Sequence, residues 1–273
     1  MKKILSLILS MVLCVTLTSC NSNQAVNAAA NSTPSPLPTL SAAPATPTGQ
    51  PAEQDQPADP VDGMYPAYVA ALENLLQRHI LPDGTDAGEQ FGDLSENQFA
   101  VYDVDRDGKD ELVLLYSTTI TAGMAGYIFA YDSASNALQT QLQEFPLLTF
   151  YENGFVKAGW SHNQGLAGDS FWPYSLYQYN PDLDRYELVG MVDAWDKSYA
   201  ETDYQNHPFP DDIDKSGTGI VYYIMEDGQY DTTNPADASA YNAWVNAYIG
   251  GASEMRIQYR NLTEANISQI KNG

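Results

Sequence analysis

Seven short segments alternate apolar and polar side chains, and this alternation constrains the fold more than any other feature. Successive side chains of a β-strand point to opposite faces of the sheet, so a period of two is typical of half-buried strands. Asn, Asp, Gly and Pro separate the segments, which favours tight turns between antiparallel neighbours. The sequence therefore predicts an antiparallel β-meander with strands within residues 98–104, 111–117, 126–132, 147–160, 174–180, 185–195 and 219–225.

Helical spacing of apolar residues occurs on both sides of these segments. One set recurs at intervals of three and four before the turn signal of residues 82–84: Tyr68, Leu72, Leu75 and Leu76. This pattern predicts an N-terminal amphipathic helix with His79 at its end. Near the C-terminus, the spacing predicts one helix after a Ser239 cap and a terminal helix that begins at Thr263. Together with the strands, these helices place the chain in the α+β class.

The composition changes at about residue 63. Residues 21–62 are rich in Pro, Ala, Ser and Thr and contain no aromatic or basic residue, so they have too little apolar surface to form a core. All 19 tyrosines and all 4 tryptophans follow this stretch. We therefore expect a disordered linker over residues 20–62 and a single globular domain over residues 63–273.

Residues 1–19 have the features of a secretory signal peptide. Lys2 and Lys3 precede an apolar run that is too short to span a bilayer permanently. The run ends at Leu17-Thr18-Ser19-Cys20, which resembles the lipobox of bacterial lipoproteins, where the leader is removed and the cysteine is lipidated. This resemblance implies a lipid such as palmitate on Cys20 and a chain anchored to the extracellular face of the cell membrane. The alternative is a plain signal peptide followed by a chance cysteine.

Cysteine content and charge exclude several classes of protein. Cys14 would leave with the leader and Cys20 would carry the lipid, so we expect neither a disulfide nor a cysteine-based zinc site. Without Lys2 and Lys3, 10 basic residues remain against 35 acidic ones, and the net charge changes from −23 to −25. A chain this acidic repels polyanions, so we expect no nucleic-acid partner.

The acidic loop, residues 103–111, concentrates oxygen ligands. Its spacing places acids at positions 1, 3, 5 and 9, glycine at position 6 and a lysine carbonyl at position 7: Asp103, Asp105, Asp107, Glu111, Gly108 and Lys109. Calcium loops use such a spacing, because alternate residues of a curling backbone turn their oxygens inward and glycine permits the sharp turn. Two other acidic turns, at residues 180–184 and 212–217, depart from the pattern and are interpreted as ordinary turns.

The acidic loop is not an EF-hand, which needs flanking helices and a glutamate where Leu114 stands. It resembles the strand–loop–strand turns, DxDxDGxxD or DxDxDGxxE, of integrin-type FG-GAP and VCBS repeats. The resemblance implies that Ca²⁺ binds to Asp103, Asp105, Asp107, the Lys109 carbonyl and Glu111. One copy does not imply a propeller, and neither do the two similar hairpins at residues 131–138 and 179–188. The alternative is an Asp-Gly hairpin turn without an ion.

A second unusual stretch is the polar loop, residues 159–174, with the sequence GWSHNQGLAGDSFWPY. Long loops of this kind often hold functional residues. The sequence suggests a pocket walled by tryptophan, in which polar side chains would bind a sugar-like ligand: Trp160, His162, Asn163, Gln164 and Trp172. The alternative is a well-packed connection whose polar side chains pair with backbone groups.

The same loop contains the candidates for catalysis. His162 and Asp169 are residue types that exchange protons, so they are the candidates for a hydrolase. Ser161 beside His162 is not interpreted as a catalytic pair, because neighbours along a strand point to opposite faces. The many acids of residues 63–273 do not reveal which two carboxylates would face each other in a glycosidase.

As a whole, the chain resembles surface lipoproteins of anaerobic, gut-type Gram-positive bacteria. The resemblance rests on the first helix ending in PDG, the DxDxDGxxE turn, and the GWSHNQG and VDAWDK stretches. It implies location and architecture but no activity. We expect a non-enzymatic, calcium-stabilised binding domain on the cell surface whose ligand is a carbohydrate, the cell wall or a protein. The alternatives are a secreted hydrolase with its site near the polar loop and a structural surface domain without a small ligand.

Overall fold

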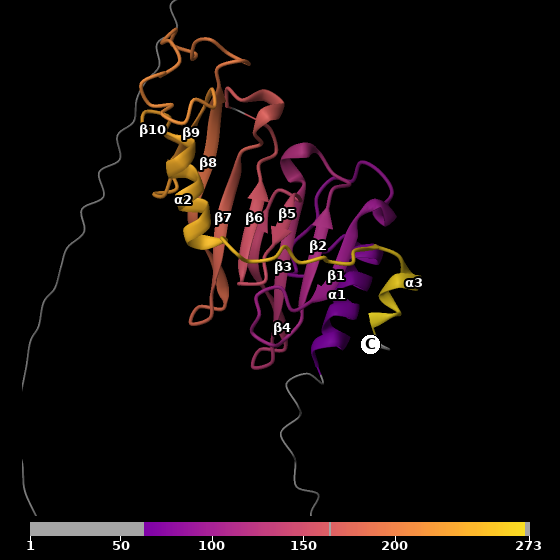
Figure 1. Cartoon of the computed structure of the whole chain (residues 1–273). Helices are drawn as coiled ribbons and strands as arrows, with labels where there is room; N and C mark the ends of the chain where they lie inside the picture. The colour runs from indigo at the N-terminus through magenta and orange to yellow at the C-terminus, as the bar shows by residue number, and fades with distance from the viewer. Residues whose placement is uncertain (1–62, 164, 271–273) are drawn as a thin grey trace, which may run out of the picture. The chain divides into compact units, whose positions relative to one another are not determined.

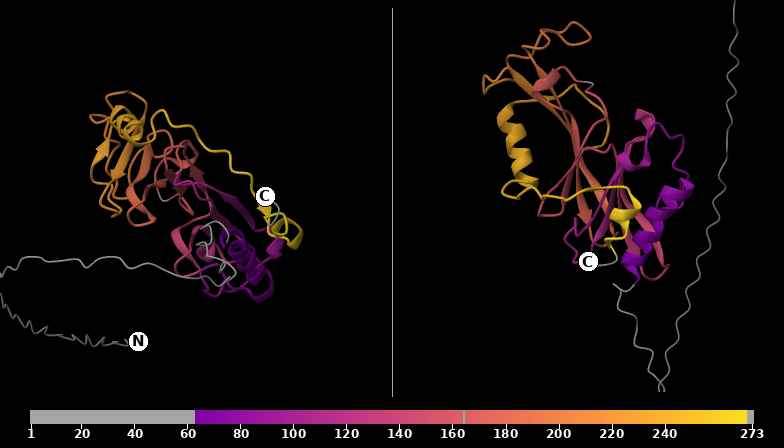
Figure 2. Two further views of the ribbon diagram at one scale, coloured as in Figure 1. Left: turned by 90° about the horizontal axis from the view of Figure 1, so that it is seen from below. Right: turned by 90° about the vertical axis from the view of Figure 1, so that its right-hand side faces the viewer.

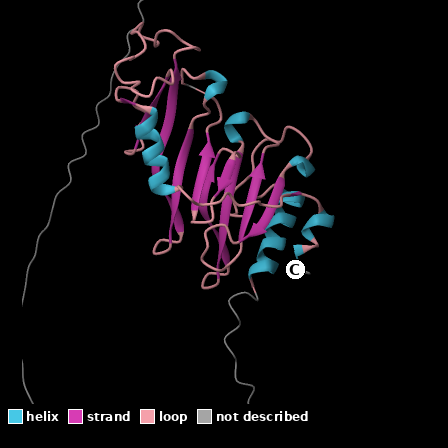
Figure 3. Ribbon diagram, viewed as in Figure 1, coloured by secondary structure: helices cyan, strands magenta, loops and turns pink. Residues whose placement is uncertain are grey.

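The computed structural model describes residues 63–163 and 165–270, which all belong to one compact unit (Figure 1). Antiparallel sheets with a few helices make up this unit (Figure 3), which confirms the predicted α+β class. The predicted signal peptide, Cys20 and the linker lie outside the described residues. Within the described ranges, no helix is both long and apolar enough to cross a membrane.

Five antiparallel strands form the first sheet. Their spatial order is β11 (Arg260–Asn261), β1 (Gln98–Tyr102), β2 (Glu111–Tyr116), β3 (Ala125–Asp132) and β4 (Ala137–Glu144). The side chains of Leu112, Val113 and Leu114 in β2 are all fully buried, so both faces of this sheet are covered. The strand at one edge comes from the far end of the chain, because β11 pairs with β1.

Six antiparallel strands form the second sheet. Their spatial order is β10 (Pro235–Ala236), β9 (Ile220–Met225), β8 (Arg185–Asp196), β7 (Tyr174–Asn180), β6 (Phe155–Gly159) and β5 (Leu148–Phe150). The predicted meander is confirmed, but it is divided into two sheets between β4 and β5. Pro146 lies at the division, and proline has no N–H with which to continue a ladder.

Helix α1 (Met64–Arg78) covers one face of the first sheet. Its buried side chains include Tyr68, Leu72 and Leu75, which belong to one apolar cluster with the strands of that sheet. The helix ends as predicted, because His79 adopts a left-handed conformation with φ of 57° and its N–H donates to the carbonyl of Leu75 at 3.1 Å. Helix α1 is therefore the amphipathic helix that the apolar spacing predicts.

Helix α2 (Ala238–Tyr248) packs against the second sheet through aromatic rings, with Tyr241 stacked on Tyr222 at a centroid distance of 4.1 Å. The predicted Ser239 cap is wrong. Asp237 caps the helix, and its carboxylate accepts the N–H of Ser239, because an acid directly before the first turn reaches the free N–H groups. Helix α3 (Glu264–Ile267) follows the predicted Thr263 cap. Three short 3₁₀ turns complete the unit: Leu94–Glu96, Thr121–Gly123 and Gly168–Ser170.

The two sheets share an apolar core, the sheet junction. One cluster takes Ala100, Val113, Ile128 and Leu142 from the first sheet and Phe150, Val156 and Tyr186 from the second. The segment between α2 and β11 runs back across the unit (Figure 2), and its Met255 packs into the same cluster. The acidic loop joins β1 to β2 next to this junction, so residues of the second sheet come within reach of it.

Candidate functional site

The acidic loop is shaped by hydrogen bonds from its own backbone. Asp103 Oδ1 accepts the N–H of Arg106 at 2.8 Å, and Asp105 Oδ1 accepts the N–H of Asp107 at 3.0 Å. The φ angles of Arg106 and Gly108 are 68° and 92°, in the left-handed region that glycine adopts without strain. The loop therefore curls at its Asp-Gly step, as the sequence predicts.

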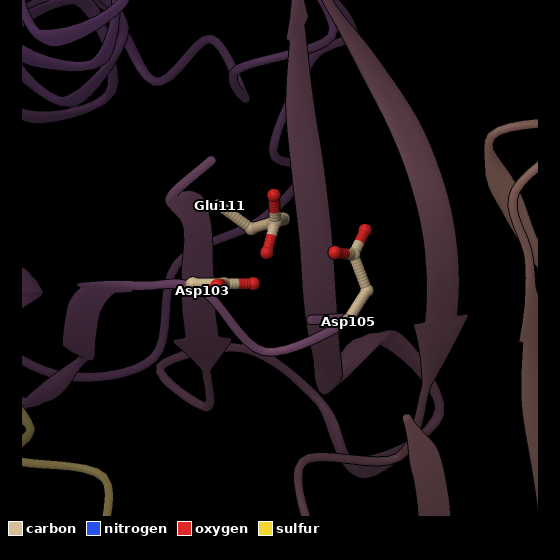
Figure 4. A group of neighbouring side chains, drawn as sticks. All are labelled: Asp103, Asp105 and Glu111. Carbon is tan, nitrogen blue, oxygen red and sulfur yellow. The ribbon is translucent and has the colours of Figure 1, made fainter. Parts of the chain in front are cut away.

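Three carboxylates meet inside this curl. One oxygen from each of Asp103, Asp105 and Glu111 lies within 4.8 Å of the others (Figure 4). Asp105 is 5% exposed and Glu111 is 2% exposed, so both are almost removed from water. Glu111 begins β2, and its Oε2 accepts the N–H of Val104 at 2.9 Å. Converging carboxylate oxygens of this kind are the ligands that hard cations such as Ca²⁺ prefer.

Burial changes the protonation of two of these acids. Burial, the largest cause, raises the pKa of Glu111 to about 9, and the charge of Asp105 raises it further. Burial also raises the pKa of Asp105 to about 6, against the lowering effect of the hydrogen bond from Asp107. An ionised carboxylate away from water loses its hydration, so in the absence of a cation Glu111 favours the protonated form at neutral pH, whereas Asp105 is still mostly ionised there. A bound divalent cation reverses that preference.

The other two predicted ligands lie differently. Asp107 does not belong to the group of three carboxylates. Its Oδ1 accepts the N–H of Lys109 at 2.8 Å, and its Oδ2 forms an ion pair with Lys109 Nζ at 3.1 Å. Exposed ion pairs contribute little to stability, so Asp107 can exchange this partner at small cost. Ligand roles for Asp107 and for the Lys109 carbonyl remain predictions.

Sequence reasoning missed the residues that approach the acidic loop from elsewhere in the fold. Gln141 Nε2 in β4 donates to Asp105 Oδ2 at 3.1 Å and to Asp184 Oδ1 at 2.7 Å. The turn that contains Asp184 was expected to be an ordinary one, but it brings the second sheet to the loop. Gln141 lies 36 residues from Asp105 in the chain, so no local spacing signals this contact.

Side chains of the polar loop donate hydrogen bonds to carbonyl groups of the same loop. Trp172 Nε1 donates to the carbonyl of Trp160 at 2.9 Å, and Trp160 Nε1 donates to Ser175 Oγ at 3.1 Å. The amide of Asn163 donates to two carbonyls of the same loop at 2.7 and 3.2 Å. These contacts favour a packed connection for Trp160 and Asn163. Gln164 lies outside the described residues.

His162 has a hydroxyl partner. Its Nδ1 lies 2.8 Å from Ser161 Oγ, and both side chains are exposed. The expectation that these neighbours point apart is wrong, because they lie in a bend after β6 and not in a strand. His162 lines a cavity of about 310 Å³ with Trp160 and Glu144. Among the described residues, no hydrogen bond joins Asp169 to His162, and the acid that lines this cavity is Glu144.

Several large aromatic side chains are exposed in the loops of the second sheet. We define the aromatic surface by four of them, with exposed fractions of 46%, 65%, 73% and 49%: Trp172, Tyr199, Tyr204 and Tyr230. The ring of Tyr230 contacts that of Trp160 at a centroid distance of 6.0 Å. Exposed rings of this kind stack on the apolar faces of ligands such as sugars. The candidate ligand-binding residue that belongs to this surface is Trp172.

No known protein family, curated protein or solved structure matches this chain. The resemblances to FG-GAP and VCBS turns and to bacterial surface lipoproteins therefore remain predictions from short motifs. Two features of the fold are candidate binding sites, the buried carboxylates of the acidic loop and the aromatic surface.

Proposed function

We propose that this chain is a calcium-stabilised binding domain held on the extracellular face of the cell membrane by a lipid on Cys20. The observation that carries the proposal is the convergence of three carboxylates, two of them buried, in the acidic loop. The calcium ion maintains the loop and the sheet junction beside it. The ligand of the domain binds elsewhere, on exposed residues of the second sheet.

The charges around the loop support a cation. None of the ion pairs among the described residues includes Asp103, Asp105 or Glu111. The two basic residues of the loop pair with other acids, Arg106 with Glu152 and Lys109 with Asp107. Buried carboxylates without a positive partner are costly when ionised, so a divalent ion supplies the charge that the protein does not.

The ligand chemistry favours calcium over other metals. The group contains only carboxylate oxygens, without the histidine or cysteine ligands typical of zinc. Calcium accepts six to eight oxygens in flexible geometries, whereas magnesium requires a near-ideal octahedron and loses its water reluctantly. A curled loop with carboxylate and backbone oxygens suits the more flexible ion.

Titration calorimetry of the full-length chain in detergent tests the proposal. We expect saturable heat with calcium, a weaker response with magnesium, and loss of the calcium heat in Asp105→Asn. The matched control is Asp212→Asn, which removes one exposed acid from another acidic turn and should leave the heat unchanged. A wild-type chain that gives no heat with calcium would refute the proposal.

The aromatic surface supports carbohydrate as the ligand class of the binding domain. Trp172, Tyr199, Tyr204 and Tyr230 present large rings to solvent although such side chains are normally buried. Flat rings bind the apolar face of a sugar ring while polar groups at their edge hold its hydroxyls. A cell-wall glycan fits this chemistry and the proposed location of the chain.

A further inference from the structure

The hairpins β3–β4 and β7–β8 have the same turn. In each, four residues separate the strands and the last is left-handed, with φ of 51° at Asn136 and 47° at Asp184. A tyrosine five residues earlier donates to that side chain, Tyr131 to Asn136 Oδ1 at 2.8 Å and Tyr179 to Asp184 Oδ1 at 2.9 Å. The turn therefore needs a side-chain oxygen at this position, and asparagine supplies it as well as aspartate.

Asp184 differs from Asn136 by its charge and by an additional partner. The amide of Gln141 donates to Asp184 Oδ1 at 2.7 Å and to Asp105 Oδ2 at 3.1 Å, so one side chain bridges carboxylates of the two sheets. A further carboxylate beside three others increases their mutual repulsion. Asp184 is exposed and shares a cavity lining with Lys109, so its charge is tolerated without a metal. Asparagine would form the same turn but would offer no charge to a cation in the acidic loop.

Two buried polar atoms in the strands beside the acidic loop lack a hydrogen-bond partner among the described residues, Gln141 Oε1 in β4 and the hydroxyl of Tyr186 in β8. These residues are 5% and 6% exposed. Tyr186 packs in the same apolar cluster as Val104 of the acidic loop. Burial, followed by the charges of Asp105 and Glu111, raises the pKa of its hydroxyl. Buried polar groups are almost always paired, so these two atoms independently indicate a ligand between the loop and β8.

We infer that the cation of the acidic loop also holds the β7–β8 hairpin, with Asp184 as its charged partner from the second sheet. This inference rests on the proposed calcium site. Asp184 acts through Gln141 and through its charge, so it is a positioning residue and not a direct ligand. The Tyr186 hydroxyl and Gln141 Oε1 bind water that the ion carries. The ion therefore joins the two sheets.

Calcium would affect the domain beyond the acidic loop. Without the ion, the carboxylates of Asp105 and Asp184 repel each other across the sheet junction, while the apolar contacts between the sheets remain. The polar contacts at the edge of the sheet junction then weaken. The ion pair between Arg106 of the acidic loop and Glu152, which lies between β5 and β6 of the second sheet, remains. With the ion, the loop and the hairpin move as one body, and the second sheet with its aromatic surface is held in place.

Calcium titration of the full-length chain in detergent tests the role of Asp184. We expect Asp184→Asn to weaken calcium affinity by about 10- to 100-fold, the range usual for residues that position metal ligands. The substitution installs the residue that the β3–β4 turn already uses, so the turn and the tyrosine contact persist. The matched control is Asp182→Asn, an exposed acid of the same turn, which should leave the affinity unchanged.

Hydrogen exchange gives a second readout that a purely structural role of Asp184 would not change. In wild-type chain, calcium should slow amide exchange in residues 179–186, whereas residues 131–138 of the matching hairpin should not respond. Asp184→Asn should remove the calcium effect on residues 179–186. Calcium binding that is equally tight in Asp184→Asn, without a change at residues 179–186, would overturn the inference and leave the calcium site intact. A wild type without calcium binding would overturn both.

Discussion

The backbone N–H of Val104 donates a hydrogen bond to Glu111 Oε2 at 2.9 Å, and this contact closes the acidic loop. This hydrogen bond joins Glu111, the first residue of β2, to Val104, which lies between Asp103 and Asp105. Glu111 is thereby held against Asp103 and Asp105, although burial disfavours its charge (Figure 4). The loop thus places a carboxylate where only a cation or a proton can neutralise it.

Glu111→Gln should abolish stabilisation by calcium and leave the metal-free fold nearly unchanged. With its pKa raised to about 9, Glu111 is mostly protonated at neutral pH without metal, and glutamine has nearly the same shape. Wild-type chain should gain about 3 kcal/mol of unfolding free energy when calcium is about 100 times its Kd, and the variant should gain none. Thermal unfolding with calcium and with chelator measures the difference.

The control for this experiment is Glu201→Gln, which neutralises an exposed acid far along the chain from the acidic loop. It should retain the full calcium-dependent rise in Tm. Equal melting curves of wild-type chain with calcium and with chelator would contradict the prediction.

Without calcium, the unfolding free energy should fall as the pH rises from 5 to 8. The folded pKa values of Asp105 and Glu111, about 6 and about 9, exceed their ordinary values of 3.8 and 4.5. The folded state therefore binds more protons in this window, and the stability present at low pH is lost as the pH increases. Urea unfolding in chelator at several pH values measures the slope.

The contribution of Glu111 to this slope can be isolated. Glu111→Gln cannot titrate at this position, so its stability should depend less on pH than that of wild-type chain. Saturating calcium should also remove the decline, because the ion replaces the protons. A metal-free stability that stays flat or increases between pH 5 and 8 would disprove the expected proton linkage.

Cys20→Ser should release the chain from the membrane. Stable attachment by acyl chains needs the lipidated thiol, since each buried methylene contributes about 0.8 kcal/mol to membrane binding. Labelling of cells with a palmitate analogue, followed by fractionation, measures both lipidation and location. Cys14→Ser is the control and should retain the label. A Cys20→Ser chain that is still labelled would show that the lipid is attached elsewhere.

Trp172→Ala should weaken glycan binding without a comparable loss of stability. The indole is 46% exposed, so its removal should alter the unfolding free energy by only about 0.5 to 1 kcal/mol, including its hydrogen bond to Trp160. A glycan array with the full-length chain in detergent measures the binding. Phe91→Ala removes an exposed ring from a loop that precedes β1 and should bind as wild type does. An array on which wild-type chain retains no glycan would remove carbohydrate as the ligand class.

Much of the fold could be predicted from side-chain alternation. The predicted segments 98–104, 111–117 and 219–225 correspond to β1, β2 and β9, although burial alternates along β9 only and β2 is buried on both faces. Strand β4 is missing from the set of alternating segments, because five of its eight residues are polar, and only the similar hairpin at residues 131–138 indicates a returning strand there. Its pairing with β3 is decided by the hairpin and not by its own composition.

Only the part of the candidate metal site that lies within the acidic loop could be predicted from the sequence. The spacing from Asp103 to Glu111 identifies the carboxylates, because all of them belong to one turn. Gln141 reaches Asp105 from β4 of the same sheet, whereas Asp184 and Tyr186 come from the second sheet, which packs against the first after the meander divides near Pro146. A proline can be read from a sequence, but the angle at which two sheets then meet depends on the packing of the whole core.

Strand β11 has a consequence for synthesis. A chain synthesised from its N-terminus contains β1 early. The edge of the first sheet is not paired until Asn261 has been made and can pair with Gln98. Until Arg260 and Asn261 leave the ribosome, that edge can pair with any other extended segment. Premature termination before Arg260 would therefore produce chains that associate with one another, although most buried residues are still present.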